Sequence, residues 1–182
     1  MRVITGSARG RKLITLEGDD VRPTTDIVKE ALFSIIQFEI EGRKVLDLFG
    51  GSGQLAIEAL SRGAESAVIV DLSKKSVEVI KQNLEHTGFS KKAVVVQSDA
   101  LSFLSRRTEK YDIALLDPPY SKGILEVALS KVHEVMNEGG VIICEAPYKD
   151  DLPEYAGNFR LQKKYRYGKT GLFLYRFSEE EE

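Results

Sequence analysis

The sequence has little cysteine and histidine, and it has no long hydrophobic run. The single cysteine, Cys144, cannot form a disulfide within the chain. The two histidines, His86 and His133, supply no cluster of metal ligands, so we expect no metal. The apolar runs are far shorter than the roughly 20 residues that span a bilayer, and the first residues lack the apolar core of a secretory signal. These absences favour a soluble, reduced, cytoplasmic protein with no membrane contact and no obligate protein partner.

The length and composition are those of one folded unit. The chain has 182 residues, of which 42% are hydrophobic and 30% charged, and this excludes a disordered or collagen-like chain. We expect an N-terminal hairpin-plus-helix appendage over residues 1–42 and a main domain over residues 43–178. The acidic tail, residues 179–182, is expected to be disordered.

The net charge of −2 hides an uneven distribution. Residues 1–16 carry +4 and residues 160–176 carry +6, and neither segment contains an acid. Such segments on an acidic chain predict a footprint for a polyanion, although solvated strand faces would look the same. The candidate RNA contacts are Arg9, Arg11, Lys12, Arg22, Lys163, Lys164, Arg166 and Lys169. We expect the two segments to meet in one patch around Asp117.

From residue 44 the pattern alternates between strand and helix. Short runs rich in Val, Ile and Leu predict strands at 44–49, 67–71, 93–97, 111–117 and 140–146, with helices near 54–62, 74–87, 100–107 and 123–136. Strands apolar on both faces predict a parallel sheet covered by helices on both sides. Residues 159–165 and 171–177 predict a closing antiparallel hairpin, and residues 2–5 and 12–16 a small N-terminal one. The predicted class is α/β, doubly wound, with seven mostly parallel strands.

The first candidate site is a glycine-rich loop that follows the first predicted core strand and runs as Asp47-Leu48-Phe49-Gly50-Gly51-Ser52-Gly53. Ligands of open α/β sheets bind at the carboxyl ends of the strands, where glycines let the backbone approach them. The loop also fits the dinucleotide fingerprint, so NAD remains an alternative. A carboxylate at Asp47 would repel a pyrophosphate and attract an ammonium group.

Two further carboxylates follow the next two predicted strands. Asp71 ends the second strand, where a carboxylate accepts hydrogen bonds from ribose hydroxyls. Asp99 ends the third strand and could contact an adenine amino group. The alternatives are structural, because Asp71 also suits a turn and Asp99 an ordinary helix N-cap.

The fourth predicted strand ends in Asp117-Pro118-Pro119-Tyr120. Proline supplies no N–H donor and has a fixed φ, so this loop presents the Asp117 carboxylate and the Pro118 carbonyl as acceptors beside an aromatic ring. Two acceptors and a stacking ring suit the exocyclic amino group of a planar base. An inert Pro-Pro turn is the alternative, and the loop by itself fits guanine, adenine or cytosine.

These motifs together resemble the S-adenosylmethionine-dependent amino-methyltransferases that act on nucleic acid bases. The chain is most similar to the bacterial 16S rRNA guanine-N2 methyltransferases of the RsmD type, and the similarity covers nearly all of it. The specific stretches are Arg22-Pro23-Thr24-Thr25-Asp26 with Lys29-Glu30-Ala31-Leu32-Phe33, Ile57-Glu58-Ala59-Leu60-Ser61-Arg62-Gly63-Ala64 and Arg166-Tyr167-Gly168-Lys169-Thr170. Two positions depart from the family pattern: Gly50 replaces the usual alanine, which would loosen the loop slightly, and Asp71 stands where glutamate is commoner.

The resemblance implies a Rossmann-like methyltransferase sheet with S-adenosylmethionine as cofactor. Its methionine portion would lie on the loop through Asp47, Phe49, Gly51 and Gly53, with Asp71 on the ribose and Asp99 on the adenine. The target guanine would be held by Asp117, Pro118 and Tyr120. The implied partner is 16S rRNA or the assembling small ribosomal subunit, at guanine 966. The alternatives are a DNA adenine-N6 methyltransferase, a non-catalytic RNA-binding protein and an NAD-dependent oxidoreductase.

Overall fold

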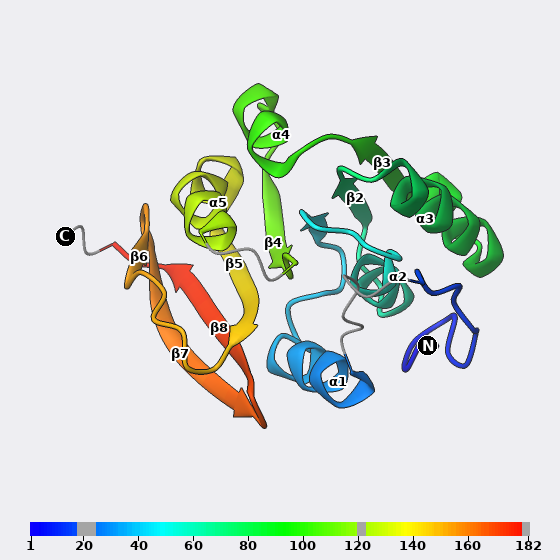
Figure 1. Cartoon of the computed structure of the whole chain (residues 1–182), viewed down its shortest axis with the longest axis horizontal. Helices are drawn as coiled ribbons and strands as arrows, with labels where there is room; N and C mark the ends of the chain where they lie inside the picture. The colour runs from blue at the N-terminus through cyan, green and yellow to red at the C-terminus, as the bar shows by residue number, and fades with distance from the viewer. Residues whose placement is uncertain (18–24, 120–122, 180–182) are drawn as a thin grey trace.

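The computed structural model describes residues 1–17, 25–119 and 123–179. Among these residues, eight strands form one sheet in the order β3-β2-β1-β4-β5-β8-β7-β6 (Figure 1). The strands are β1 (Lys44–Asp47), β2 (Ser66–Asp71), β3 (Ala93–Gln97), β4 (Tyr111–Leu116), β5 (Met136–Pro147), β6 (Tyr155–Ala156), β7 (Phe159–Tyr167) and β8 (Thr170–Phe177). The helices are α1 (Asp26–Ile35), α2 (Gln54–Ser61), α3 (Lys74–Thr87), α4 (Ala100–Arg106) and α5 (Ile124–Val132), with 3-10 turns at Ser90–Lys92 and His133–Val135.

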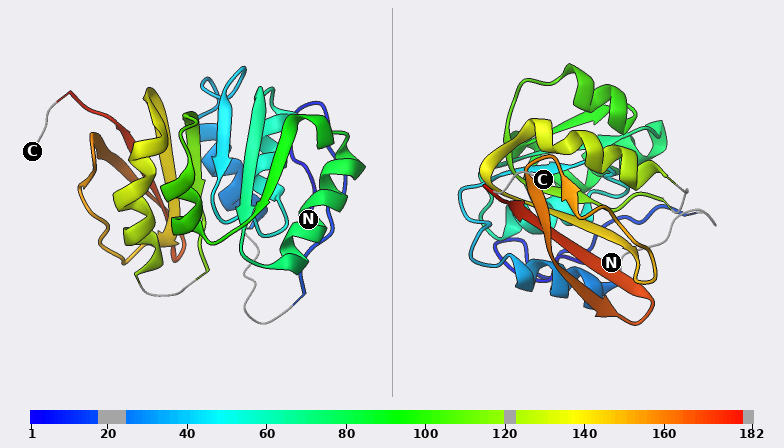
Figure 2. Two further views of the ribbon diagram at one scale, coloured as in Figure 1. Left: turned by 90° about the horizontal axis from the view of Figure 1, so that it is seen from above. Right: turned by 90° about the vertical axis from the view of Figure 1, so that its left-hand side faces the viewer.

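The sheet is buried on both faces because successive residues of its central strands are both apolar. Val45 packs in the core on the side of α1, α2 and α3, whereas Leu46 packs in the core on the side of α4 and α5. Ile143 and Ile142 of β5 divide between the two cores in the same way. Figure 2 shows the helices as layers on either side of the sheet. Within the described residues, no helix is long and apolar enough to cross a membrane.

The predicted doubly wound fold is confirmed. Strands β1 to β5 pair in parallel, and β8 and β7 close the sheet as an antiparallel hairpin. The sheet has one strand more than the seven predicted, because the two-residue strand β6 is too short to leave a sequence pattern. Helix α5 ends at Val132 and β5 already begins at Met136, so this helix is shorter and this strand longer than predicted.

The N-terminal segment, residues 1–17, differs from the predicted regular hairpin. It makes one antiparallel bridge, between Arg2 and Lys12, and then folds against helix α2. The reason lies in its N–H groups, because those of Ile4 and Thr5 donate to the side chain of Glu58 and not to a partner strand. Further along the segment, the Asn83 side chain of α3 accepts from the N–H of Ile14 and donates to its carbonyl.

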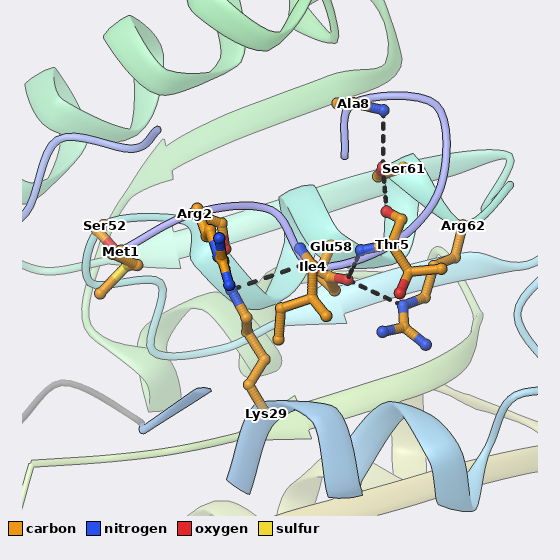
Figure 3. Close-up of polar contacts among 10 residues, drawn as sticks. All are labelled: Met1, Arg2, Ile4, Thr5, Ala8, Lys29, Ser52, Glu58, Ser61 and Arg62. Carbon is orange, nitrogen blue, oxygen red and sulfur yellow. Dashed lines mark hydrogen bonds and ion pairs between the residues drawn. The ribbon is translucent and has the colours of Figure 1, made fainter. Parts of the chain in front are cut away.

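Glu58 is a fully buried carboxylate that joins three parts of the chain (Figure 3). Its two oxygens accept the backbone N–H groups of Ile4 and Thr5 at 2.9 Å each. The Lys29 ammonium of α1 lies 3.7 Å from one oxygen, and the Arg62 guanidinium donates to the other at 3.0 Å. Lys29 is also fully buried, and this burial lowers its pKa. The cluster therefore holds the N-terminal segment, α1 and α2 together.

We expect Glu58→Ala to destabilise the chain by about 3–5 kcal/mol, because it leaves the buried Lys29 without its carboxylate partner. It also removes the acceptors of two backbone N–H groups. Urea unfolding at pH 7 measures the loss, with Glu65→Ala as the control because Glu65 is an exposed acid just beyond α2. The interpretation fails if the two variants are equally stable.

Candidate functional site

A cavity of about 440 Å³ lies at the carboxyl ends of the parallel strands. It is lined by the loop after β1, by residues at the ends of β2, β3, β4 and β5, and by part of the N-terminal segment. Phe49, Gly51, Asp71, Asp99, Asp117 and Pro118 of the predicted site line it, together with Met1, Thr15, Leu16, Leu48, Gly50, Ser52, Gln54, Leu55, Leu72, Ser76, Ser98, Ala100, Pro119, Ile124 and Glu145. The topology therefore brings most of the predicted site residues together, because the carboxyl ends of parallel strands share one edge.

The glycine loop needs its glycines for two different physical reasons. Gly51 and Gly53 have φ values of 59° and 81°, in the left-handed region that side chains disfavour. Gly50 is needed for space, because a Cβ there would lie 2.5 Å from the Ile69 Cγ2 atom and 3.0 Å from Ile80 Cδ1. The side chains of Ile69 and Ile80 thus fill the space that an alanine at position 50 would use, and the expected loosening of the loop stays a prediction.

Asp71 fixes the glycine loop and faces the cavity. One of its carboxylate oxygens accepts the N–H of Gly51 at 2.8 Å, and the other accepts the N–H of Ser73 at 2.9 Å. A carboxylate oxygen can accept more than one hydrogen bond. Asp71 can therefore hold the loop and also accept from hydroxyl groups in the cavity, so the turn and ribose readings are compatible.

Asp99 is an exposed helix N-cap as well as a cavity residue. Its carboxylate accepts the N–H of Ser102 at 2.9 Å at the start of α4. Hydrogen bonds from Ser102 lower the pKa of Asp99, so the group is ionised at neutral pH. The structural alternative for this residue is thus present, and a contact with adenine stays a prediction.

Asp47 lies behind the loop and not on the cavity wall. It is 1% exposed, and neither of its carboxylate oxygens has a hydrogen-bond partner among the described residues. Burial raises its pKa to about 7, and the charges of Asp117 and Asp71 act in the same direction. The nearby backbone N–H groups of Ala56 and Phe49 lower this pKa only in part. An uncompensated buried carboxylate is costly. It fits a cofactor that carries a positive charge. Gly53, the other predicted residue absent from the cavity wall, is the N-cap of α2.

Gln54 was missed by the sequence prediction. It lines the cavity, is 8% exposed, and its Oε1 atom has no hydrogen-bond partner among the described residues. Gln54 thus provides an acceptor without a partner on the cavity wall, and Asp47 provides a second one behind the glycine loop. Acceptors at these places suit the ammonium group of S-adenosylmethionine. Its position directly after Gly53 was the only sequence signal for it.

Asp117 and Pro118 lie half-buried at the far end of this cavity, where a second cavity of about 740 Å³ begins. Pro118, Pro119 and Glu145 line both. Tyr120, the predicted stacking ring, lies outside the described residues. Among the described residues, no three His, Cys, Asp or Glu side chains are grouped to hold a metal ion.

The basic residues near the C-terminus lie at the same edge as the cavities. Thr170 pairs with Pro147, so the β7–β8 turn stands at the carboxyl end of β5. Lys164 donates to the Asp150 carbonyl at 3.0 Å, and Lys164 and Arg166 lie 4.5 Å and 4.9 Å from the Tyr148 ring. Lys163 and Lys169 belong to the same hairpin, which therefore carries the four predicted contacts Lys163, Lys164, Arg166 and Lys169, as well as Arg160 and Arg176.

The prediction that both basic segments form one patch is wrong. The loop containing Arg9 and Arg11 lies at the C-terminal ends of α2 and α3, since Ser7 donates to the Ser61 carbonyl and Arg11 to the His86 carbonyl. These helices run back from the site, so their C-termini lie toward the opposite edge of the sheet. Figures 1 and 2 show the blue N-terminal segment and β7 at opposite ends of the molecule. Lys12 lies on the same segment as Arg9 and Arg11, and Arg22 lies outside the described residues.

The fold and the site define a class of protein: a doubly wound α/β protein with a glycine-loop cavity for a nucleotide-containing cofactor. The family model described as Conserved hypothetical protein 95 matches residues 1–176. YlbH of Bacillus subtilis is 40% identical over 181 residues, which cover 97% of this chain and 98% of that protein. Ribosomal RNA small subunit methyltransferase D of Escherichia coli K12 is 33% identical over 177 residues, covering 96% and 89%.

Solved structures agree with these sequence relatives. The structure of yhhF from Escherichia coli has a TM-score of 0.87 at 31% identity, and the match covers 98% of this chain and 99% of that one. The chain belongs to the RsmD-type rRNA methyltransferase family, and this confirms the resemblance found in the sequence.

The buried Asp47 carboxylate leads to a prediction about pH. Its pKa is about 7 in the folded chain and close to 3.8 in the unfolded one, so the folded chain binds more protons between these values. The contribution of Asp47 to stability therefore falls as pH rises from 5 to 8. We expect Asp47→Asn, which cannot titrate, to become progressively more stable relative to the wild type over this range. Urea unfolding at four pH values without cofactor tests this, and a constant difference would contradict it.

Proposed function

We propose that this chain transfers a methyl group from S-adenosylmethionine to the N2 amino group of a guanine in 16S rRNA. We infer guanine 966 as the target and the cytoplasm as the place of the reaction. The observation that carries the proposal is that Asp117 and Pro118 border the same cavity as the glycine loop, Asp71 and Asp99. The acceptors for an amino group thus stand at the end of a cavity whose other parts suit a nucleoside with a positively charged side chain.

Each proposed cofactor residue binds a different part of S-adenosylmethionine. Asp71 accepts from the ribose hydroxyls while its bond to Gly51 keeps the loop in place. Asp99 accepts from the adenine amino group at the end of β3. Gln54 supplies an acceptor for the ammonium group from the cavity wall, and the buried Asp47 carboxylate attracts the positive charge from behind the loop. When bound, S-adenosylmethionine supplies a methyl group on a positively charged sulfur.

Asp117 and Pro118 act on the base. The lone pair of the guanine amino nitrogen is delocalised into the ring, which makes this nitrogen a poor nucleophile. The Asp117 carboxylate and the Pro118 carbonyl accept hydrogen bonds from its two N–H groups and so turn the lone pair toward the methyl group. Such positioning can lower a barrier by roughly 7–11 kcal/mol. The Asp117 charge also stabilises the positive charge that develops on nitrogen, until one proton passes from the nitrogen to Asp117 or to water.

The test is methyl transfer to small-subunit particles from a strain that lacks the enzyme, with the modified nucleoside identified by mass spectrometry. We expect N2-methylguanosine. Methylated adenine in DNA, reduction of a substrate with NAD, or binding of RNA without methylation would each replace the proposal by one of the alternatives.

Two variants test cofactor binding and base positioning separately. We expect Asp71→Ala to weaken S-adenosylhomocysteine binding about tenfold or more, because hydrogen bonds to charged groups contribute about 1.5–3 kcal/mol. We expect Asp117→Ala to abolish methyl transfer while the cofactor affinity changes only a few-fold, because alanine removes the acceptor for the amino group. Titration calorimetry and transfer rates measure both. If Asp117→Ala kept more than about a tenth of the wild-type rate, the positioning argument would be wrong.

The RNA footprint is proposed for the β7–β8 hairpin alone. It stands beside the site, whereas the Arg9–Arg11 loop does not. Each phosphate contact removed lowers the salt slope of binding by about 0.7–0.9. We expect Arg166→Ala with Lys169→Ala to lower this slope, and the matched pair Arg9→Ala with Arg11→Ala to leave it unchanged. RNA binding at several salt concentrations measures both pairs, and the opposite ranking would move the footprint to the N-terminal loop.

A further inference from the structure

Glu145 is a buried acid beside the base-binding loop that the proposed function has not used. It is 6% exposed at the end of β5 and lines both cavities, as Pro118 and Pro119 also do. Leu116 of β4 pairs with Cys144 of β5, so Asp117 and Glu145 are the next residues along two neighbouring strands. Neighbouring strands lie about 4.8 Å apart. Two carboxylates therefore flank the place where the two cavities meet.

A second acceptor at this place distinguishes the bases that carry an amino group. In guanine the ring nitrogen next to the amino group, N1, carries a hydrogen. In adenine and cytosine the ring nitrogen next to the amino group is an acceptor. A carboxylate beside the amino-binding loop accepts the guanine N1–H and repels the lone pair of the other two bases. Glu145 takes part in another interaction within the chain, but a carboxylate has about four acceptor positions.

We propose that Glu145 is the residue that selects guanine, by accepting its N1–H while Asp117 and Pro118 hold the amino group. This inference rests on the proposed function and adds the selectivity that the Asp-Pro-Pro loop lacks, because that loop by itself fits any base with an amino group. A buried site that offers an acceptor discriminates strongly, since the wrong base leaves that acceptor unmatched.

The experiment compares guanine with 2-aminopurine at the methylated position. 2-Aminopurine keeps the amino group on C2, but its N1 is an acceptor. Small-subunit particles are reconstituted with 16S rRNA in which a synthetic segment carries either base. The rates of methyl transfer give a guanine to 2-aminopurine ratio for the wild type and for Glu145→Gln. The amide of glutamine can donate to N1 of 2-aminopurine, which a carboxylate cannot.

We expect Glu145→Gln to lower this ratio by about 100-fold or more, given the size of discrimination by buried hydrogen-bonding sites. Glu126→Gln is the matched control, because it removes an acid that lines the second cavity only. It should leave the ratio unchanged. Binding of S-adenosylhomocysteine should stay within twofold in both variants, since neither residue belongs to the cofactor set.

The outcomes separate this inference from the proposed function. If the wild type methylates neither base, the proposed function is wrong. If the wild type methylates guanine and Glu145→Gln keeps the wild-type ratio, Glu145 does not select the base and only this inference is overturned. If Glu145→Gln does not fold, Glu145→Asp decides, because it keeps the charge but withdraws the acceptor by one methylene. A guanine rate at least tenfold lower with unchanged cofactor affinity supports the role, and an unchanged rate overturns it.

Discussion

The buried carboxylate of Glu58 is the interaction on which the packing of the N-terminal segment and α1 against α2 depends. It accepts two backbone N–H groups of the N-terminal segment and balances the buried Lys29 ammonium of α1. This arrangement keeps the segment against α2, and from there its two ends reach the cavity, where Met1, Thr15 and Leu16 form part of the wall. The contacts of Glu58 on α2 thus affect the shape of the cavity, because they hold the middle of the N-terminal segment whose two ends form part of the cavity wall.

The parallel sheet has an electrostatic consequence at its carboxyl edge. Acids end β1 and β2, follow β3 and β4 within two residues, and lie near the end of β5. All of them except Asp47, which lies behind the glycine loop, line one cavity. Carboxylates so close together favour a positively charged ligand and repel a pyrophosphate or an RNA phosphate. Under the proposed function the RNA backbone is held by cations outside this acidic zone, and the β7–β8 hairpin carries the proposed candidates Lys164, Arg166 and Lys169.

The sequence predicted the sheet and the cavity well because both depend on local patterns. Strands that are apolar on both faces read as continuous runs, and a residue that ends such a run must lie at the ligand-binding edge. The path of residues 1–17 could not be predicted, because it depends on Glu58, which reads in the sequence as an ordinary helix surface residue. Glu145 was hidden for a similar reason, since its role appears only when β5 is placed beside β4.

The acceptors of Asp47 and Gln54 that have no hydrogen-bond partner lower the stability of the folded chain when no ligand occupies the cavity. Asp47 is buried without a hydrogen-bond partner among the described residues, and its raised pKa measures the preference of this place for the uncharged acid. A ligand that brings a positive charge stabilises the ionised form, so cofactor binding and folding are linked through this group. Replacing Asp47 by a neutral side chain would relieve the free chain and weaken the bound one. Asp47 therefore opposes the folded state of the free chain at neutral pH, and a positively charged ligand would offset that cost.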